Sequence, residues 1–132
     1  FCGDTLFAGG CGYLFDGPPA KMHTSLMRLA GLPGDTRVCC AHEYTADNLL
    51  FARFVEPGNA ALQARSERVQ AVLDAGGCAV PSTIEEERAT NPFLRPGSPE
   101  IRASLAAHGT SVDTHLQAFT ATRALKDRKL HR

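Results

Sequence analysis

Several features that would indicate a function class at once are scarce or missing in this 132-residue chain. It contains no tryptophan, and aromatic residues make up only 7% of it. No apolar run approaches the ~18 residues that a membrane-spanning helix needs, and no signal-peptide pattern precedes the first apolar segment. Basic and acidic residues number 14 each, so the formal net charge is zero. Charge and hydropathy therefore favour neither nucleic acid nor a membrane as a partner.

Cysteine is present, but without the spacing of a metal-binding or disulfide-rich module. The five cysteines are Cys2, Cys11, Cys39, Cys40 and Cys78. No C-x-x-C pair occurs, which excludes the ligand spacing of a zinc finger or ribbon, and the odd number argues against a disulfide framework. We therefore expect free thiols in a reducing cytoplasm, most of them as small buried apolar residues.

The first part of the chain has the pattern of alternating strands and helices. Residues 1–8 and 36–41 are short apolar runs typical of buried, parallel-type strands. Apolar residues at helical spacing follow the first run over 18–32 and the second from Thr45, which is a candidate N-cap. The order strand, helix, strand, helix is typical of an α/β layer arrangement.

After the sequence EPGN at 56–59 the pattern changes to helices alone, with no convincing strand. Ser82 and Thr83 each have a glutamate three residues later, which gives two overlapping capping-box candidates. Ser98-Pro99-Glu100 predicts another helix start, and a last helix carries Arg123 and Lys126. The sequence therefore predicts an α/β part over 1–57 and an all-helical part over 58–132.

The predicted α/β part is too small to cover both faces of a sheet. Two buried strands need neighbours on each side, and about 57 residues do not supply them. The chain also begins at Phe1, inside what reads as the middle of a fold. We expect the missing sheet partners to lie in sequence upstream of this residue.

Two polar residues stand where the predicted strands end. Asp4 lies in GDTLF and His42 follows VCCA. Taken singly, each is explained by a local structural role, such as a carboxylate bonded to backbone amides. Together they suggest metal ligands, because ligands gather at the carboxyl ends of parallel strands. Two ligands are too few for a catalytic zinc ion, which usually has three from the protein.

Longer strings in the sequence carry a family resemblance that covers essentially the whole chain. GDTLFAGGCG, CAHEYTADNLLFA, EPGN, NPFLR and RALKD, in this order, resemble hydroxyacylglutathione hydrolases (glyoxalase II) of the metallo-β-lactamase fold superfamily. GDTLF is general to that superfamily, whereas the HEYT string combined with NPFLR and R-x-x-K-D is more specific. The resemblance implies the C-terminal part of an αββα metallo-β-lactamase-like sandwich followed by an all-α C-terminal domain.

The resemblance also implies a binuclear metal centre with a bridging hydroxide. Asp4 would bridge two divalent ions and act in catalysis, and His42 would complete the second site. The ions would be zinc, with iron or manganese as alternatives. The family's other ligands lie upstream, in a T-x-H-x-H-x-D-H motif and a further His, so we expect this chain alone to be inactive. The implied reaction is hydrolysis of S-D-lactoylglutathione to glutathione and D-lactate, which detoxifies methylglyoxal.

Substrate contacts follow from the same resemblance. Arg123 and Lys126 lie three residues apart on one helix face and match contacts to the glycine carboxylate of glutathione. Tyr44 matches the tyrosine of HEYT. Tyr13 stands where a basic residue is common, and it can still contact the substrate through its hydroxyl or its backbone, although the charge is lost. Phe15 stands where some members have tyrosine. These two differences affect substrate affinity more than reaction class. Arg128, Lys129 and Arg132 are interpreted as a solvated helix end.

Two other interpretations stay open at this point. One is a different enzyme of the same fold, such as a persulfide dioxygenase or a generic thioesterase. The other is a non-catalytic, glutathione-binding helical module. For the intact protein we expect a cytoplasmic monomer whose partner is the glutathione thioester, with neither nucleic acid nor membrane involved.

Overall fold

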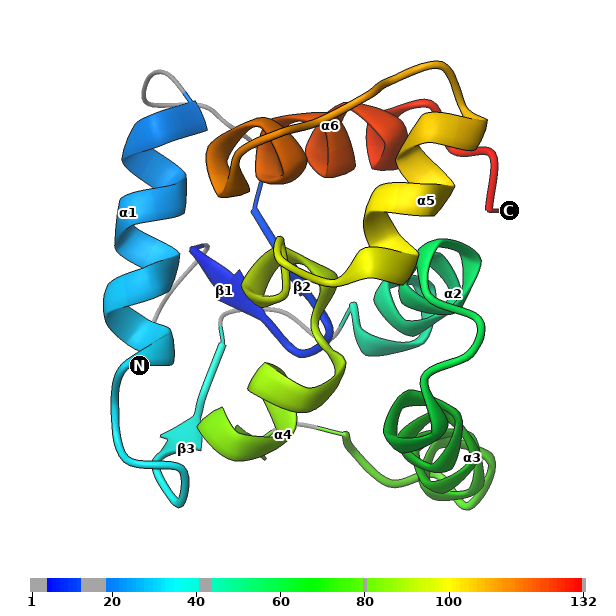
Figure 1. Cartoon of the computed structure of the whole chain (residues 1–132). Coiled ribbons are helices and arrows are strands. Elements are labelled where there is room, and N and C mark those ends of the chain that lie inside the picture. The colour runs from blue at the N-terminus through cyan, green and yellow to red at the C-terminus, as the bar shows by residue number, and fades with distance from the viewer. Residues whose placement is uncertain (1–4, 13–18, 41–43, 80, 132) are drawn as a thin grey trace.

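The structure is a computed structural model that describes residues 5–12, 19–40, 44–79 and 81–131. The described residues are mostly helical, with two sheets of two short strands each (Figure 1). In chain order the elements are β1 (Leu6–Phe7), β2 (Gly10–Cys11), α1 (Pro19–Ala30), β3 (Arg37–Val38), α2 (Thr45–Val55), α3 (Ala60–Asp74), β4 (Ser82–Thr83), α4 (Ile84–Thr90), the 3-10 helix η1 (Pro92–Leu94), α5 (Pro99–Ala107) and α6 (His115–Asp127).

The sheets differ from the predicted buried parallel strands. β1 and β2 form an antiparallel hairpin, and β3 pairs antiparallel with β4, which lies far along the sequence. The prediction that no strand follows residue 57 was therefore wrong. A two-residue strand is too short to show alternation, so only its partner reveals it. Over the described residues, the six α-helices are consistent with the predicted helical C-terminal domain, and the strands form only these two small sheets.

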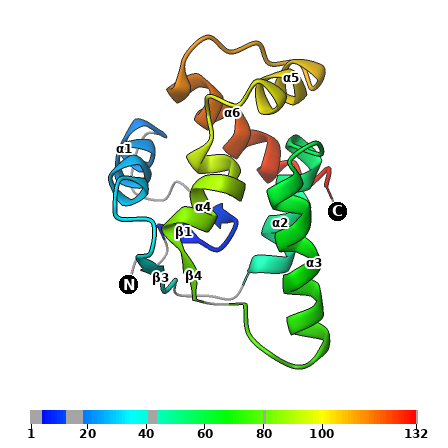
Figure 2. The same ribbon diagram turned by 60° about the horizontal axis from the view of Figure 1, so that its bottom comes forward.

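The helices enclose the β1–β2 hairpin. Figures 1 and 2 show α1 on one side of the hairpin and the adjacent helices α2 and α3 on the other, with α5 and α6 together at one end. Both β1 residues are buried, as are Gly10 and Cys11 of β2. The glycine-rich turn GGCG, residues 9–12, thus lies inside the molecule.

One hydrophobic core joins the predicted α/β part to the helical part. The Phe93 ring lies 6.1 Å from that of Phe51 and 5.9 Å from that of Phe119, and all three side chains are almost fully buried. Leu6, Leu26 and Val38 of the first part belong to the same cluster as Ile101, Leu105 and Leu125 of the second. The core is continuous across residue 57. The division of the chain into two domains at that residue stays a prediction.

Side-chain caps fix most helix starts. Thr83 accepts a hydrogen bond from the Glu86 amide, and Ser98 accepts one from the Ile101 amide, as the sequence predicts. Of the two capping-box candidates, Ser82 instead donates its hydroxyl to Glu87. The predicted Thr45 cap was wrong, because Thr45 is the first residue of α2 and its cap position is Tyr44.

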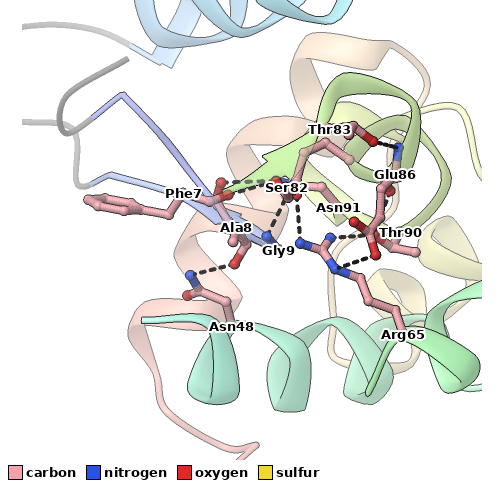
Figure 3. Close-up of polar contacts among 12 residues, drawn as sticks. Phe7, Ala8, Gly9, Asn48, Arg65, Ser82, Thr83, Glu86, Thr90 and Asn91 are labelled. Carbon is pink, nitrogen blue, oxygen red and sulfur yellow. Dashed lines mark hydrogen bonds and ion pairs between the residues drawn. The ribbon is translucent and has the colours of Figure 1, made fainter. Parts of the chain in front are cut away.

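The Glu87 carboxylate is a fully buried charged group in the described part of the chain. Its Oε2 accepts from Arg65 Nη2 at 2.7 Å and from the Ser82 hydroxyl at 2.6 Å. Its Oε1 accepts from the Gly9 amide at 2.9 Å and from Asn91 Nδ2 at 3.0 Å. Figure 3 shows these partners converging from the hairpin, α3 and β4.

Asn91, the first residue of NPFLR, holds the turn from the same side. Its Nδ2 also donates to the Gly10 carbonyl at 3.0 Å, while its Oδ1 accepts from the Phe93 amide at 2.9 Å. Gly9 has φ +76°, a left-handed conformation that favours glycine. The GGCG and NPFLR strings are thus two sides of one contact.

The EPGN and NPFLR strings meet in a second polar cluster. The buried Glu56 carboxylate pairs with Arg95 Nε and Nη2, both at 2.9 Å, and accepts from Ser98 Oγ and Asn59 Nδ2. Burial alone would raise the pKa of Glu56, but the hydrogen bonds from Arg95, Ser98 and Asn59 lower it. This cluster ties the end of α2 to the start of α5.

The cysteine prediction holds only in part. Cys11, Cys39, Cys40 and Cys78 are thiols that take no part in a disulfide, as expected. Only Cys11 of these four is buried, and Cys78 is exposed. Cys2 lies outside the described residues. No helix in the described ranges is both long and apolar enough to cross a membrane.

The Glu87 contacts generate the first prediction. Glu87→Gln removes the fully buried carboxylate partner of the Arg65 guanidinium, which is only 1% exposed and keeps only the more exposed Glu86 carboxylate, at 3.4 Å. Breaking a buried ion pair from one side costs about 3–5 kcal/mol, so we expect the free energy of unfolding to fall by that amount in urea titration. Glu85→Gln, at an exposed glutamate of the same helix, is the matched control and should change stability by less than about 0.5 kcal/mol. Equal urea midpoints for the two variants would contradict the prediction.

Candidate functional site

The predicted site residues divide into two groups. Asp4, Tyr13 and His42 lie outside the described residues, as do Phe15 and Arg132. Tyr44, Arg123 and Lys126 lie within them, and all three adjoin the β1–β2 hairpin through the contacts below.

Arg123 extends from α6 to the open end of the hairpin. Its Nη1 donates to the Cys11 carbonyl at 3.0 Å and to the Gly12 carbonyl at 3.5 Å, and it lies 3.7 Å from the Cys11 sulfur. Its Nη2 pairs with Asp127 one turn later on the helix, at 2.7 Å. The residue is only 4% exposed. The guanidinium is therefore held in one orientation by backbone carbonyls on one side and a carboxylate on the other.

Lys126 lies one turn after Arg123 on the same face and is 8% exposed. Its ammonium donates to Oδ1 of Asn48 on α2. The amide nitrogen of Asn48 donates in turn to the Ala8 carbonyl at 3.2 Å (Figure 3). Lys126 is thus connected to the hairpin through one side chain.

A single aromatic ring lies beneath both cations. The Phe93 ring centroid is 5.3 Å from the Arg123 guanidinium carbon and 5.8 Å from Lys126 Nζ. Phe51 contributes a second ring, 5.9 Å from Lys126 Nζ. These distances are within the range in which a ring face attracts a cation. The phenylalanine of NPFLR therefore belongs to the site as well as to the core.

Tyr44 lies at the other side of the hairpin. It precedes α2, is 52% exposed, and its ring centroid is 5.2 Å from that of Phe7. The exposed phenol is therefore a hydroxyl beside β1 that can donate or accept a hydrogen bond.

Close approach between the hairpin and α2 explains the second glycine of GGCG. A Cβ at Gly10 would lie 2.7–2.8 Å from the side-chain carboxamide atoms of Asn48. Those separations are shorter than contacts that real Cβ atoms make, so only glycine fits without moving Asn48. The turn and Asn48 are therefore matched to each other.

The site shifts the protonation of its own groups. Burial, together with the positive charge of Arg123, lowers the pKa of Lys126 to about 8, although Cys11, Asp47 and Asp127 act to raise it. Burial raises the pKa of the Cys11 thiol, although Arg123 opposes that effect. A thiol in that state is a packing group rather than a nucleophile, in line with the expectation that most of the cysteines are small buried apolar residues.

Sequence reasoning gave no role to Asn48, which turns out to contact both the hairpin and Lys126. The sequence does contain a pattern that points to Asn48, because this residue lies on the same helical stripe as the buried Phe51, Ala52 and Val55. A polar residue on a buried stripe needs a partner. The sequence could flag Asn48 in this way but could not name Lys126 as the partner.

Metal donors do not cluster in the part of the chain that the structure describes. No group of three or more His, Cys, Asp and Glu side chains there could hold a metal ion. Of the C-terminal basic residues, Arg128 and Lys129 are exposed, as predicted. His131, which had no predicted role, has a nearly buried side chain 3.3 Å from Asp47 and edge-on to Phe51.

Comparison with known proteins gives a consistent result. The family model described as "Hydroxyacylglutathione hydrolase C-terminus" matches residues 43–129. A hydroxyacylglutathione hydrolase of Cupriavidus taiwanensis is 57% identical over 127 residues, which cover 96% of this chain and 48% of that protein. Those of Methylococcus capsulatus and Ectopseudomonas mendocina are 55% and 54% identical, with 96% of this chain and 48% and 50% of theirs covered. The chain thus spans about half the length of the curated relatives it matches.

The lowered pKa of Lys126 predicts a pH-dependent stability. Between about pH 8 and pH 10.5, Lys126 is protonated in the unfolded chain but neutral in the folded one. The free energy of unfolding should therefore rise with pH across that window. A shift of this size corresponds to about 3 kcal/mol. Lys126→Met should remove this rise from urea titrations taken between the two pH values. Lys129→Met, at an exposed lysine two residues beyond α6, should retain it, and parallel curves for wild type and Lys126→Met would refute the prediction.

Proposed function

The chain belongs to the hydroxyacylglutathione hydrolase family, and on that premise we propose that it serves the hydrolysis of S-D-lactoylglutathione to glutathione and D-lactate in a longer protein. The match to the C-terminal family model favours this reaction over other enzymes of the fold, since it includes the helical region with NPFLR and R-x-x-K-D. The proposed physiological role is detoxification of methylglyoxal in the cytoplasm by a monomeric enzyme.

The observation that carries the proposal is the pair of buried cations on one face of α6. Arg123 and Lys126 both lie over Phe93, beside the carbonyls of the glycine-rich turn. Two fixed cations in a desolvated setting attract a carboxylate more strongly than solvated lysines do. We assign them to the glycine carboxylate of glutathione, with Tyr44 and Tyr13 as further contacts to the peptide. The chain's own contribution is then to bind and orient the non-reacting part of the thioester.

The metal centre belongs to the proposal through residues outside the described ranges. Asp4 would bridge two divalent ions, most simply zinc, and His42 would complete the coordination of one of them. The described residues include no such donor set, so the part assigned to them in the reaction is substrate binding. Residues 1–57 are proposed as the end of the metallo-β-lactamase-like domain, and residues 58–132 as its helical substrate-binding domain.

The assignment of Arg123 and Lys126 to the glycine carboxylate predicts a specific kinetic effect in the longer protein. Arg123→Ala and Lys126→Ala should each raise KM for S-D-lactoylglutathione about 10-fold or more, while kcat changes little, because the lost contact is to a remote part of the substrate. Steady-state kinetics at pH 7 measures both constants.

Two neighbouring residues provide the control. Arg128→Ala and Lys129→Ala remove the same charges from the exposed end of the helix and should leave KM within about 2-fold of wild type. Unchanged KM in the Arg123 and Lys126 variants, or an equal rise in all four variants, would reject the proposal that Arg123 and Lys126 bind the carboxylate.

Asp4 gives an independent test of the proposed metal centre. In the longer protein, Asp4→Ala should remove thioesterase activity and lower the metal content in the same preparation. Metal content by elemental analysis and activity on S-D-lactoylglutathione are the two readouts. Full metal loading with full activity in the variant would exclude Asp4 as a ligand.

A further inference from the structure

We propose that Asn48 is a positioning residue for the carboxylate site: its carboxamide fixes the Lys126 ammonium against the glycine-rich turn so that this cation can bind a carboxylate of the ligand. The inference rests on the proposed function for the identity of that ligand. Its own basis is the geometry between α2, α6 and the hairpin.

The orientation of the Asn48 amide is determined by its two neighbours. Nδ2 donates to the Ala8 carbonyl at 3.2 Å, an interaction that only the nitrogen end of the amide can make. Oδ1 then faces Lys126 Nζ and accepts from it. Asn48 itself is 3% exposed and is enclosed by the turn, where it fills the space that a Cβ at Gly10 would need. The amide therefore cannot turn over or move away without breaking both contacts.

The ammonium depends on this one acceptor among the described residues. An ammonium has three N–H donors, and Asn48 takes one of them in hydrogen-bond geometry. Phe51 and Phe93 lie under the charge as ring faces and accept no further conventional hydrogen bond. Among the described residues the other two N–H donors of the ammonium meet no hydrogen-bond acceptor, which leaves them for a ligand. The hydrogen bond to Asn48 sets the directions in which they point.

Groups of both signs act on Lys126, and their net effect together with burial is to disfavour its charged form. Arg123 repels the ammonium, while Cys11 on β2, Asp47 on α2 and Asp127 on α6 favour it. Burial disfavours the charged form most of all. An acceptor on Nζ stabilises the protonated state, so its removal should leave the lysine neutral at a lower pH.

Two substitutions separate positioning from a purely structural role. Asn48→Leu and Asn48→Asp both remove the amide nitrogen, and with it the hydrogen bond to Ala8. They act on Lys126 in opposite directions, because leucine removes the acceptor and aspartate replaces it with a negative charge. A merely structural effect of losing the Ala8 contact would have the same sign in both variants.

The experiment is run on the longer protein with lysine labelled with ¹³C at Cε, the Lys126 signal being assigned by its absence from Lys126→Met. NMR titration should show the pKa of Lys126 falling in Asn48→Leu and rising in Asn48→Asp, each by about one unit. The pH at which glutathione binding weakens, measured by calorimetry, should move in the same directions. Shifts of one sign in both variants, or no shift in either, would overturn the inference.

The glycine ethyl ester of glutathione keeps the proposed function and the inference distinguishable. Unmodified protein should bind glutathione at least about 10-fold more tightly than this ester at pH 7, since the ester lacks the carboxylate. Equal binding of the two ligands, with the opposite pKa shifts present, would reject the proposed ligand and support the role of Asn48 on Lys126. Suppose instead that unmodified protein, Asn48→Leu and Asn48→Asp all prefer glutathione over the ester, with the same pH dependence. That result would support the proposed ligand and reject the role of Asn48 on Lys126.

Discussion

The buried Glu87 carboxylate is the contact on which the arrangement of this molecule depends most. A carboxylate has about four acceptor positions, and here four donors fill them, from Gly9, Asn91, Arg65 and Ser82. Taking this charge out of water is costly, and the cost is offset only because every position is used. The four donors lie on the hairpin, after α4, on α3 and on β4. One side chain of α4 thereby connects segments that share no continuous secondary structure.

The proposed binding site depends on this contact indirectly, through the glycine-rich turn. Glu87 and Asn91 hold the left-handed turn at Gly9, and the turn aims the carbonyls of Cys11 and Gly12 at Arg123. The residue two positions after Asn91 is Phe93, whose ring lies beneath both cations. Disturbing the carboxylate would therefore displace the acceptors of Arg123 and the ring under Lys126 together. Stability and ligand binding are coupled here through the backbone of the turn.

Much of this could be predicted from the sequence, within a definite limit. Helix starts at Thr83 and Ser98 depend on local side-chain hydrogen bonds, and local spacing revealed them. Arg123 and Lys126 share a helix face for the same reason. The pairing of β3 with β4 and the contact between Asn91 and Gly10 join residues far apart in sequence, and no local pattern encodes them. Of these residues, Asn91 and Gly10 belong to the NPFLR and GDTLFAGGCG strings that carry the family resemblance, so those two strings meet in a buried contact.

The buried carboxylates and the buried ammonium of this chain differ in how many of their hydrogen-bonding positions the described residues fill. At Glu87 and Glu56 each carboxylate is closed off by donors from the protein, so these groups serve the fold. At Lys126 the described surroundings supply a single hydrogen-bond acceptor, while burial and Arg123 both oppose the charge. Folding gains nothing from a cation kept in that state, since methionine would fill the same space over Phe51 and Phe93. A buried ammonium held in place but left partly unsatisfied is understandable once an anion completes its coordination. This state of Lys126 supports, without appeal to any resemblance, our proposal that a carboxylate binds beside the hairpin.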